Sequence, residues 1–122
     1  MHHLSNWIEI PAIDLERAKK FYSEILGTKL IDMRIGNTEY AIFSTEDQFN
    51  SGALACGKSY KPSQSGGLIY LNGGKDLSEI LNRVQKAGGK VLLEKKFLAK
   101  EAGFIGYFTD TEGNKIGLQS AS

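Results

Sequence analysis

Glu9 is the acidic side chain best placed for chemistry, because it stands in a segment with the alternation of a strand. Ile8 and Ile10 alternate with Trp7 and Glu9, so the two pairs should face opposite sides of a sheet. If the isoleucines pack against a helix, Trp7 and Glu9 face away from it. A carboxylate in an apolar cleft can act as a general base or hold a cationic group, and an indole can stack on a planar ligand. The alternatives are a Glu9 at the rim, paired with Lys or Arg, and a Trp7 that fills space or packs at a dimer interface.

Other candidate side chains lie on segments that also read as strands. Tyr40 and Tyr70 offer hydroxyl groups and aromatic faces, although tyrosine is equally common in strands for packing alone. Leu68 and Tyr70 lie two positions apart in the predicted strand, so their side chains should lie on the same face. We expect this to be the face on which Trp7 and Glu9 lie in the first module. Gln119 offers one amide near the C-terminus, and Phe108 is expected either as a wall of the site or as core.

The residue types argue against a transition-metal site. Such a site normally needs imidazole, thiolate or carboxylate ligands. The chain has one cysteine, Cys56, and two histidines, His2 and His3, which are either native or the remnant of an expression tag. Glu9 is the only carboxylate expected among the inward-facing side chains. The residues therefore predict no metal ligand, and the single cysteine, which excludes an internal disulfide, is typical of a reducing cytoplasm.

The elements that position these residues occur twice along the chain. In the first copy, a helix capped by Asp14 and closed by Gly27 follows the strand that ends at Pro11. Asp14 recurs 62 positions later as Asp76, and Gly27 recurs at the same offset as Gly89. Because a repeat of half the chain is too long for a solenoid, we expect two copies of one module that share a buried surface.

Each copy is predicted to have the order βαβββ. In the first, strands are expected at 28–35, 39–44 and 51–57, with a hairpin turn at Gly36-Asn37. In the second, the first strand covers 67–72, the helix starts at Asp76 with Glu79 in a capping box, and Gly88-Gly89 closes it. Strands are then expected at 91–93, 104–109 and 115–120, with a loop or irregular strand at 95–102. The prediction is one α+β domain over 1–122, made of module one (5–57), a linker (58–66) and module two (67–120), whose helices cover the outer face of a concave mixed sheet.

Composition limits the classes of partner. The chain has 122 residues, a net charge of +1 and a hydrophobic content of 41%. A charge so close to zero does not attract nucleic acid or an anionic membrane. No apolar run reaches the length of a membrane span, and the N-terminus does not read as a signal peptide. We therefore expect a cytoplasmic protein with neither a nucleic-acid nor a membrane partner.

Three stretches carry a resemblance to a known family. They are IPAIDLERAKKFYSEILG at 10–27, KDLSEILNRVQKAGGKV at 75–91 and FTDTEGNKIGLQS at 108–120. With them the chain resembles the vicinal oxygen chelate superfamily of glyoxalase I, bleomycin resistance proteins and extradiol dioxygenases. The resemblance implies paired βαβββ modules, a small-molecule cleft and a homodimer with clefts at or near its interface.

The same resemblance implies four positions for metal ligands, one on the first and one on the last strand of each module. In this sequence they fall on Trp7, Leu68, the segment 41–43 and Gly117, and none of these residues can ligate a metal. We therefore expect a small-molecule-binding protein without the catalytic metal, and a ligand that is planar or hydrophobic. The alternative is a glyoxalase-like lyase or isomerase with a divalent Ni, Zn, Mn or Fe ion.

Two further hypotheses stay open at this point. One is a metal-free enzyme that uses Glu9, the only candidate for a catalytic group. The other is a protein-interaction module with a filled hollow. For the binder, the predicted ligand-binding set is Trp7, Glu9, Tyr40, Leu68, Tyr70, Phe108, Gly117 and Gln119.

Overall fold

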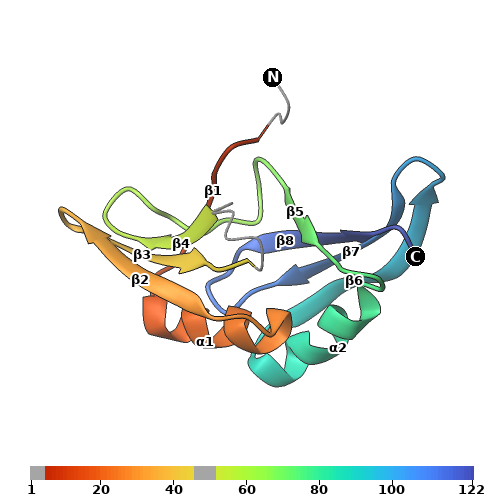
Figure 1. Ribbon diagram of the computed structural model, residues 1–122, viewed down its shortest axis with the longest axis horizontal. Coiled ribbons are helices and arrows are strands. Elements are labelled where there is room, and N and C mark those ends of the chain that lie inside the picture. Colours follow the sequence, from red (N-terminus) through yellow and green to blue (C-terminus); the bar gives the residue numbers. More distant parts are fainter. Residues whose placement is uncertain (1–4, 46–51) are drawn as a thin grey trace.

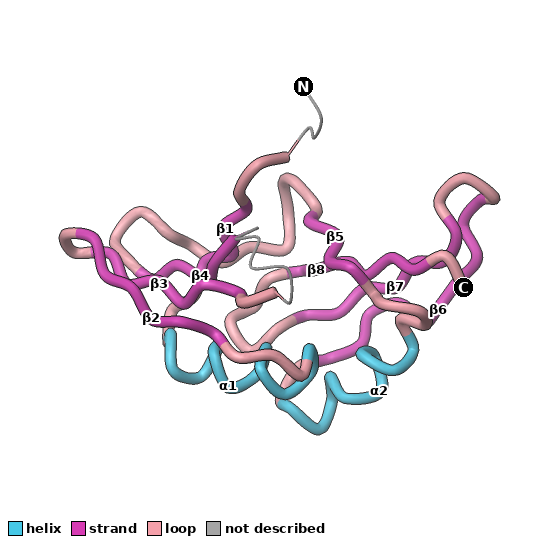
Figure 2. The backbone as a smooth tube through the Cα atoms, viewed as in Figure 1, coloured by secondary structure: helices cyan, strands magenta, loops and turns pink. Residues whose placement is uncertain are grey.

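The computed structural model describes residues 5–45 and 52–122, and they form two βαβββ modules. His2, His3 and Ser51 lie outside the described residues. Both helices lie on the same side of the strands (Figures 1 and 2). The predicted α+β fold is therefore confirmed. The elements, in chain order, are β1 (Ile8–Pro11), α1 (Leu15–Leu26), β2 (Leu30–Ile35), β3 (Thr38–Phe43), β4 (Gly52–Cys56), β5 (Ile69–Asn72), α2 (Ser78–Ala87), β6 (Lys90–Ala99), β7 (Gly103–Thr109) and β8 (Lys115–Ser120).

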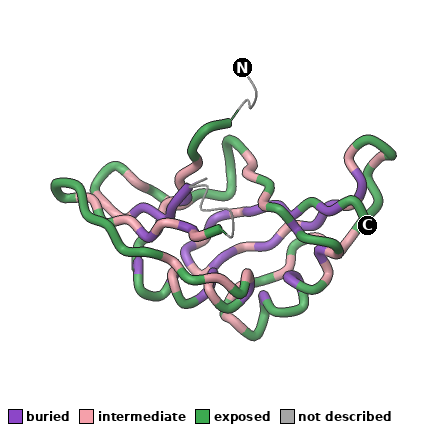
Figure 3. Tube along the Cα trace, viewed as in Figure 1, coloured by how far each residue is buried: buried purple, intermediate pink, exposed green. Residues whose placement is uncertain are grey.

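The two modules build equivalent mixed sheets. The strand order is β1-β4-β3-β2 in the first sheet and β5-β8-β7-β6 in the second. In each sheet the first strand pairs in parallel with the last strand of its module, and the other pairs are antiparallel. Buried positions gather on β4, β7 and β8, whereas the edge strand β2 is largely exposed (Figure 3).

The first helix has the predicted ends. The carboxylate of Asp14 accepts a hydrogen bond of 3.1 Å from the backbone N–H of Arg17, and Gly27 closes the helix with φ 65°. Such a side-chain cap satisfies one of the open amides of the first turn. Left-handed φ values cost glycine nothing, which explains its place at this end.

The start of the second helix differs from the prediction. Leu77 rather than Asp76 occupies the N-cap, and its hydrocarbon side chain, which has no hydrogen-bond acceptor, is buried in the core instead of capping the helix. Asp76 instead accepts from the backbone and the hydroxyl of Ser78, at 2.9 and 2.7 Å, and pairs with Lys95 at 2.9 Å. The Ser78 bond and the Lys95 ammonium lower the pKa of Asp76 to about 2.

Strand β6 is longer than the sequence indicates. The predicted strand at 91–93, followed by a loop or irregular strand at 95–102, is in fact a strand of 10 residues, Lys90–Ala99. Its register against β7 shifts between Val91 and Leu93, between Leu93 and Lys96, and between Phe97 and Ala99. Burial alternates from Lys90 to Lys96 but not from Lys96 to Leu98, which are all exposed, so the strand lacks a single alternation over its whole length.

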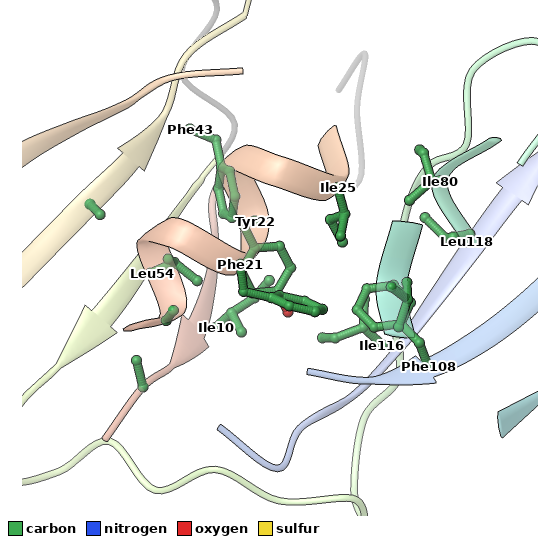
Figure 4. Close-up of a cluster of buried hydrophobic side chains, with 14 of the residues drawn as sticks. Ile10, Phe21, Tyr22, Ile25, Phe43, Leu54, Ile80, Phe108, Ile116 and Leu118 are labelled. Carbon is green, nitrogen blue, oxygen red and sulfur yellow. The ribbon is translucent and has the colours of Figure 1, made fainter. Parts of the chain in front are cut away.

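One core lies between the helices and both sheets (Figure 4). Phe21 and Tyr22 of α1 contact Phe108 of β7, with ring centroids 5.8 and 6.4 Å apart. On the other side, the ring of Tyr22 meets the ring of Phe43 edge to face, at 5.7 Å. The expectation that the modules share a buried surface is therefore confirmed.

Buried polar contacts also join the modules, through the β7–β8 turn. Glu112 accepts hydrogen bonds from the backbone N–H groups of Ile13 and Asp14, at 2.8 and 2.7 Å. Its carboxylate also pairs with Arg17 of α1, at 2.7 Å from Nε. A turn of the second module thus binds the loop and the helix start of the first.

A second carboxylate of the β7–β8 turn, that of Asp110, connects the two modules inside the core. Asp110 accepts from the hydroxyl of Tyr22 at 2.6 Å and from the amide of Asn114 at 2.9 Å. The Asn114 amide also donates to the carbonyl of Pro11, at 2.7 Å. Burial, together with the Asp110 charge, raises the pKa of Tyr22 well above its ordinary value, so this phenol stays protonated. Residues 110–114 therefore have a structural role, since they connect the two modules.

Candidate functional site

The side of the two sheets that faces away from the helices, which we call the open face, carries the candidate site. On β1, Ile10 is buried against the helices, so Glu9 points to the open face with Trp7 beside it. The indole N–H of Trp7 donates to Oε2 of Glu9 at 3.1 Å. Glu9 is half-buried, and Trp7 is 38% exposed. The predicted orientation of this pair is therefore confirmed.

Tyr60 completes this group, although nothing in the sequence points to it. It lies in the 58–66 linker, where no periodicity marks one side chain above another. Its hydroxyl donates to Oε1 of Glu9 at 2.5 Å, and its ring meets the ring of Tyr40 edge to face at 6.4 Å. The bond to Glu9, with a smaller contribution from Tyr40, raises the pKa of Tyr60 above its ordinary value. The four residues Trp7, Glu9, Tyr40 and Tyr60 are called the Glu9 cluster below.

A second group of predicted residues lies on the open face of module two. Tyr70 of β5 is paired in register with Gly117 of β8, and its ring covers that glycine. A Cβ at position 117 would lie 2.6 Å from a carbon of the Tyr70 ring. The hydroxyl oxygens of Tyr70 and Tyr107 lie 3.1 Å apart, and this bond raises the pKa of Tyr70 to about 12. The ammonium of Lys115 sits 4.6 Å from the centre of the Tyr107 ring, a cation–π contact.

Next to Tyr70 lies a cleft of about 560 Å³. Gln119 lines it together with Asn72 and residues 100–103 of the β6–β7 turn. The side-chain N–H of Gln119 already donates to the carbonyl of Ala102 at 2.5 Å. The Gln119 carbonyl oxygen and the charged ends of Lys100 and Glu101 therefore give this cleft a polar character.

The structure thus divides the predicted ligand-binding set. Trp7, Glu9 and Tyr40 gather in module one, and Tyr70, Gly117 and Gln119 gather in module two. Leu68 is half-buried just before β5 and belongs to neither hydrogen-bonded group.

Phe108 does not belong to the site. It is fully buried on the helix side of β7, against Phe21 and Tyr22, so the prediction that it contacts a ligand is wrong. Tyr107, its neighbour in sequence, points to the opposite, open face, where its hydroxyl contacts that of Tyr70. Because β7 is a central strand, apolar or aromatic residues occupy both of its faces, so the sequence left Phe108 as either a wall of the site or core.

Within residues 5–45 and 52–122, no group of three or more His, Cys, Asp or Glu side chains is arranged to hold a metal ion. Over the same part of the chain, no helix is long and apolar enough to cross a membrane.

Comparisons with known proteins agree with this architecture. The sequence profile of the Glyoxalase/Bleomycin resistance protein/Dioxygenase superfamily matches residues 4–118. A glyoxylase-like domain-containing protein of Didymella fabae is 32% identical over 117 residues, which cover 93% of this chain and 91% of that protein.

Two solved structures show the same fold at lower identity. Glyoxalase I from Zea mays superposes with a TM-score of 0.71 at 23% identity, and the match covers 95% of this chain but 45% of the maize protein. TnmS3, an antibiotic-binding protein from Streptomyces sp. CB03234, superposes with a TM-score of 0.66 at 24% identity, over 100% of this chain and 98% of that one. With the profile match over nearly its whole length, the chain belongs to the Glyoxalase/Bleomycin resistance protein/Dioxygenase superfamily.

Proposed function

We propose that the protein binds a small molecule on the open face and does so without the catalytic metal of its superfamily. The observation that carries this proposal is the ring of Tyr70 over Gly117. The resemblance assigns this position to a carboxylate ligand, yet here an aromatic ring fills the space into which that side chain would project.

The other three ligand positions support the same proposal. Trp7 and Leu68 have no lone pair suited to a metal, and neither have the residues at 41–43. Glu9 is a carboxylate on the same strand face as Trp7, but both of its oxygens already accept hydrogen bonds, from Trp7 and Tyr60. This donor set does not fit a transition metal, which needs several imidazole, thiolate or carboxylate ligands around one point.

The open face suits a planar or hydrophobic ligand. Trp7, Tyr40 and Tyr70 present aromatic surface there, and such surface gains from stacking. The likeness to an antibiotic-binding protein is compatible with a binding role. We further propose that two copies associate so that their open faces enclose the ligand, because β2 leaves apolar side chains exposed on this side.

Metal content and ligand-induced stabilisation test the proposal on one sample. The untagged protein is analysed for bound metal by mass spectrometry and then heated with Ni²⁺, Zn²⁺, Mn²⁺, Fe²⁺ or a chelator. A metal that binds only the folded state must raise the melting temperature by mass action. We expect no stoichiometric metal and no shift with chelator, but a shift with members of a library of planar small molecules.

The opposite result identifies the alternative. Stoichiometric metal, or a melting temperature that falls with chelator, would replace the proposal with a glyoxalase-like, metal-dependent lyase or isomerase. Lyase and isomerase activity would then be assayed with the metal-loaded protein.

A further inference from the structure

Glu9 is a carboxylate without a cationic partner in the described part of the chain. Its two hydrogen-bond donors, the indole of Trp7 and the hydroxyl of Tyr60, are both neutral. The ion pairs of residues 5–45 and 52–122 involve other acids, namely Glu16, Asp32, Asp76 and Glu112. Within the described residues, the half-buried Glu9 cluster therefore contains a carboxylate that forms no ion pair.

The surroundings of this carboxylate are aromatic, and the neighbouring strand β4 carries only small side chains on the same face. Glu9 pairs in register with Ala53 of β4, and Tyr40 pairs with Ala55 of the same strand. Because β4 carries only methyl groups on this face, no bulky side chain of that strand separates the carboxylate from the Tyr40 ring. Tyr60 comes from the linker and stands edge to face against Tyr40, at 80°.

We propose that the Glu9 cluster recognises an organic cation with N–H donors, that is, a primary ammonium, amidinium or guanidinium group on the ligand. Each carboxylate oxygen accepts one hydrogen bond from the protein and keeps a second lone pair for the ligand. The exposed face of Trp7 stabilises the same positive charge by a cation–π contact. This inference rests on the proposed function, since it names the chemistry of the small molecule that the open face binds.

The rival explanation is purely structural. In that case the bond between Tyr60 and Glu9 only fastens the 58–66 linker to the first sheet. Replacing Glu9 would then change stability, but it would not change which ligands bind.

Three probes of one shape separate these explanations: benzamidinium (cationic), benzamide (neutral) and benzoate (anionic). Trp7 is the single tryptophan of the sequence, so its fluorescence reports binding at the cluster itself. Titrations use the full chain, as the wild type, as Glu9→Gln and as the matched control Glu24→Gln, which removes an exposed carboxylate from the far side of α1. Gln keeps the size of Glu9 and its acceptor oxygen but not its charge.

We expect wild-type and Glu24→Gln proteins to bind benzamidinium about tenfold or more tightly than benzamide, in line with the strength of charged hydrogen bonds. Added salt should reduce this preference by screening. Glu9→Gln should lose the preference while its melting temperature confirms that it is folded. Equal binding of all three probes, no change of Trp7 fluorescence with any probe, or a preference that survives in Glu9→Gln would each overturn the inference. The planar-ligand library tests the proposed function separately, because neutral ligands that stabilise the wild type would support it even where the cation preference fails.

Discussion

Tyr70 and Gly117 show how one residue fixes the identity of another across two strands. The aromatic ring lies where a side chain at position 117 would begin, so only glycine fits without movement of the ring. Tyr70 is 43% exposed and is held by its hydroxyl contact to Tyr107. The ring can therefore move, but its movement costs free energy, and this cost can be measured.

Gly117→Ala should lower the free energy of unfolding by about 1–2 kcal/mol, the usual cost of a modest overpacking. The cost should fall in a Tyr70→Ala background, because the ring that the new methyl group meets is gone. Urea unfolding of the two single variants and the double variant measures this coupling. Gly67→Ala is the matched control, since its Cβ would meet nothing within 4 Å. An equal cost in both backgrounds would contradict the assigned contact.

Tyr22→Phe tests the buried hydrogen bond between Tyr22 and Asp110. The variant leaves the buried Asp110 without the hydroxyl that donates at 2.6 Å, and a lost bond to a buried charged group costs about 1.5–3 kcal/mol. Tyr107→Phe removes a hydroxyl from the open face, where water can replace its partner, and should cost less than half as much. Both values come from denaturant unfolding. A similar loss in the two variants would mean that Asp110 finds another donor.

At the scale of elements, the β7–β8 turn positions the start of α1. Burial acts to raise the pKa of Glu112. Hydrogen bonds to its carboxylate lower this pKa by more than burial raises it, and they come from Arg17, the Asp14 and Ile13 backbone and the Thr111 hydroxyl. The net result is a pKa below the usual value, so the folded state favours the ionised carboxylate.

Glu112→Gln should therefore destabilise the protein most at neutral pH, by about 1–3 kcal/mol for a hydrogen bond between charged groups. A lowered folded-state pKa contributes stability above the pKa of the unfolded chain, and this contribution is lost as the pH falls through the folded-state value. The difference between wild type and variant should shrink from about pH 5 downward. Urea unfolding at a series of pH values measures it, with Glu24→Gln as the control. A difference that stays constant with pH would contradict the role given to the charge.

The sequence predicted the elements wherever local signals decide them. The cap at Asp14 and the glycine at 27 mark the first helix, and the turn at Gly36 marks the first hairpin. It did not predict the full length of β6, because the shifts in register break the alternation that a pattern requires.

The sequence predicted part of the candidate site, again only where a local pattern decides which way a side chain points. Strand parity placed Trp7 and Glu9 correctly, since the apolar partners of these residues are confined to one face. The sequence left Phe108 open between a wall of the site and the core, because its strand is apolar on both faces, and the structure places it in the core. Tyr60 was missed because its position depends on how the linker folds back on the sheet, a tertiary effect that leaves no local pattern.

At the scale of the whole molecule, no residue among 5–45 and 52–122 covers the open face of the edge strand β2. Ile31, Met33 and Ile35 alternate on one side of this strand and are 57%, 40% and 60% exposed. Met33 pairs in register with Tyr40 and Ile31 with Ile42, so the apolar surface continues toward the Glu9 cluster. A surface of this kind favours association with a second copy.

We predict a homodimer in solution, with a mass of twice 13.4 kDa by light scattering after size-exclusion chromatography. Ile31→Lys should weaken the dimer at least tenfold, because it places a charge in the apolar contact. Ile13→Lys is the control, since Ile13 is 69% exposed in the β1–α1 loop and away from β2. A wild-type monomer at high protein concentration, or equal behaviour of the two variants, would contradict the prediction.

The ring of Tyr70 over Gly117 also bears on evolution. A carboxylate ligand introduced at position 117 alone would collide with this ring, and a smaller residue introduced at position 70 alone would uncover a glycine with nothing to offer a metal. Either first step gives a protein that is less stable or no more capable than its parent. Under the proposed metal-free function, a change to a metal-binding sequence would therefore need both substitutions together, because neither one alone brings a gain on which selection could act.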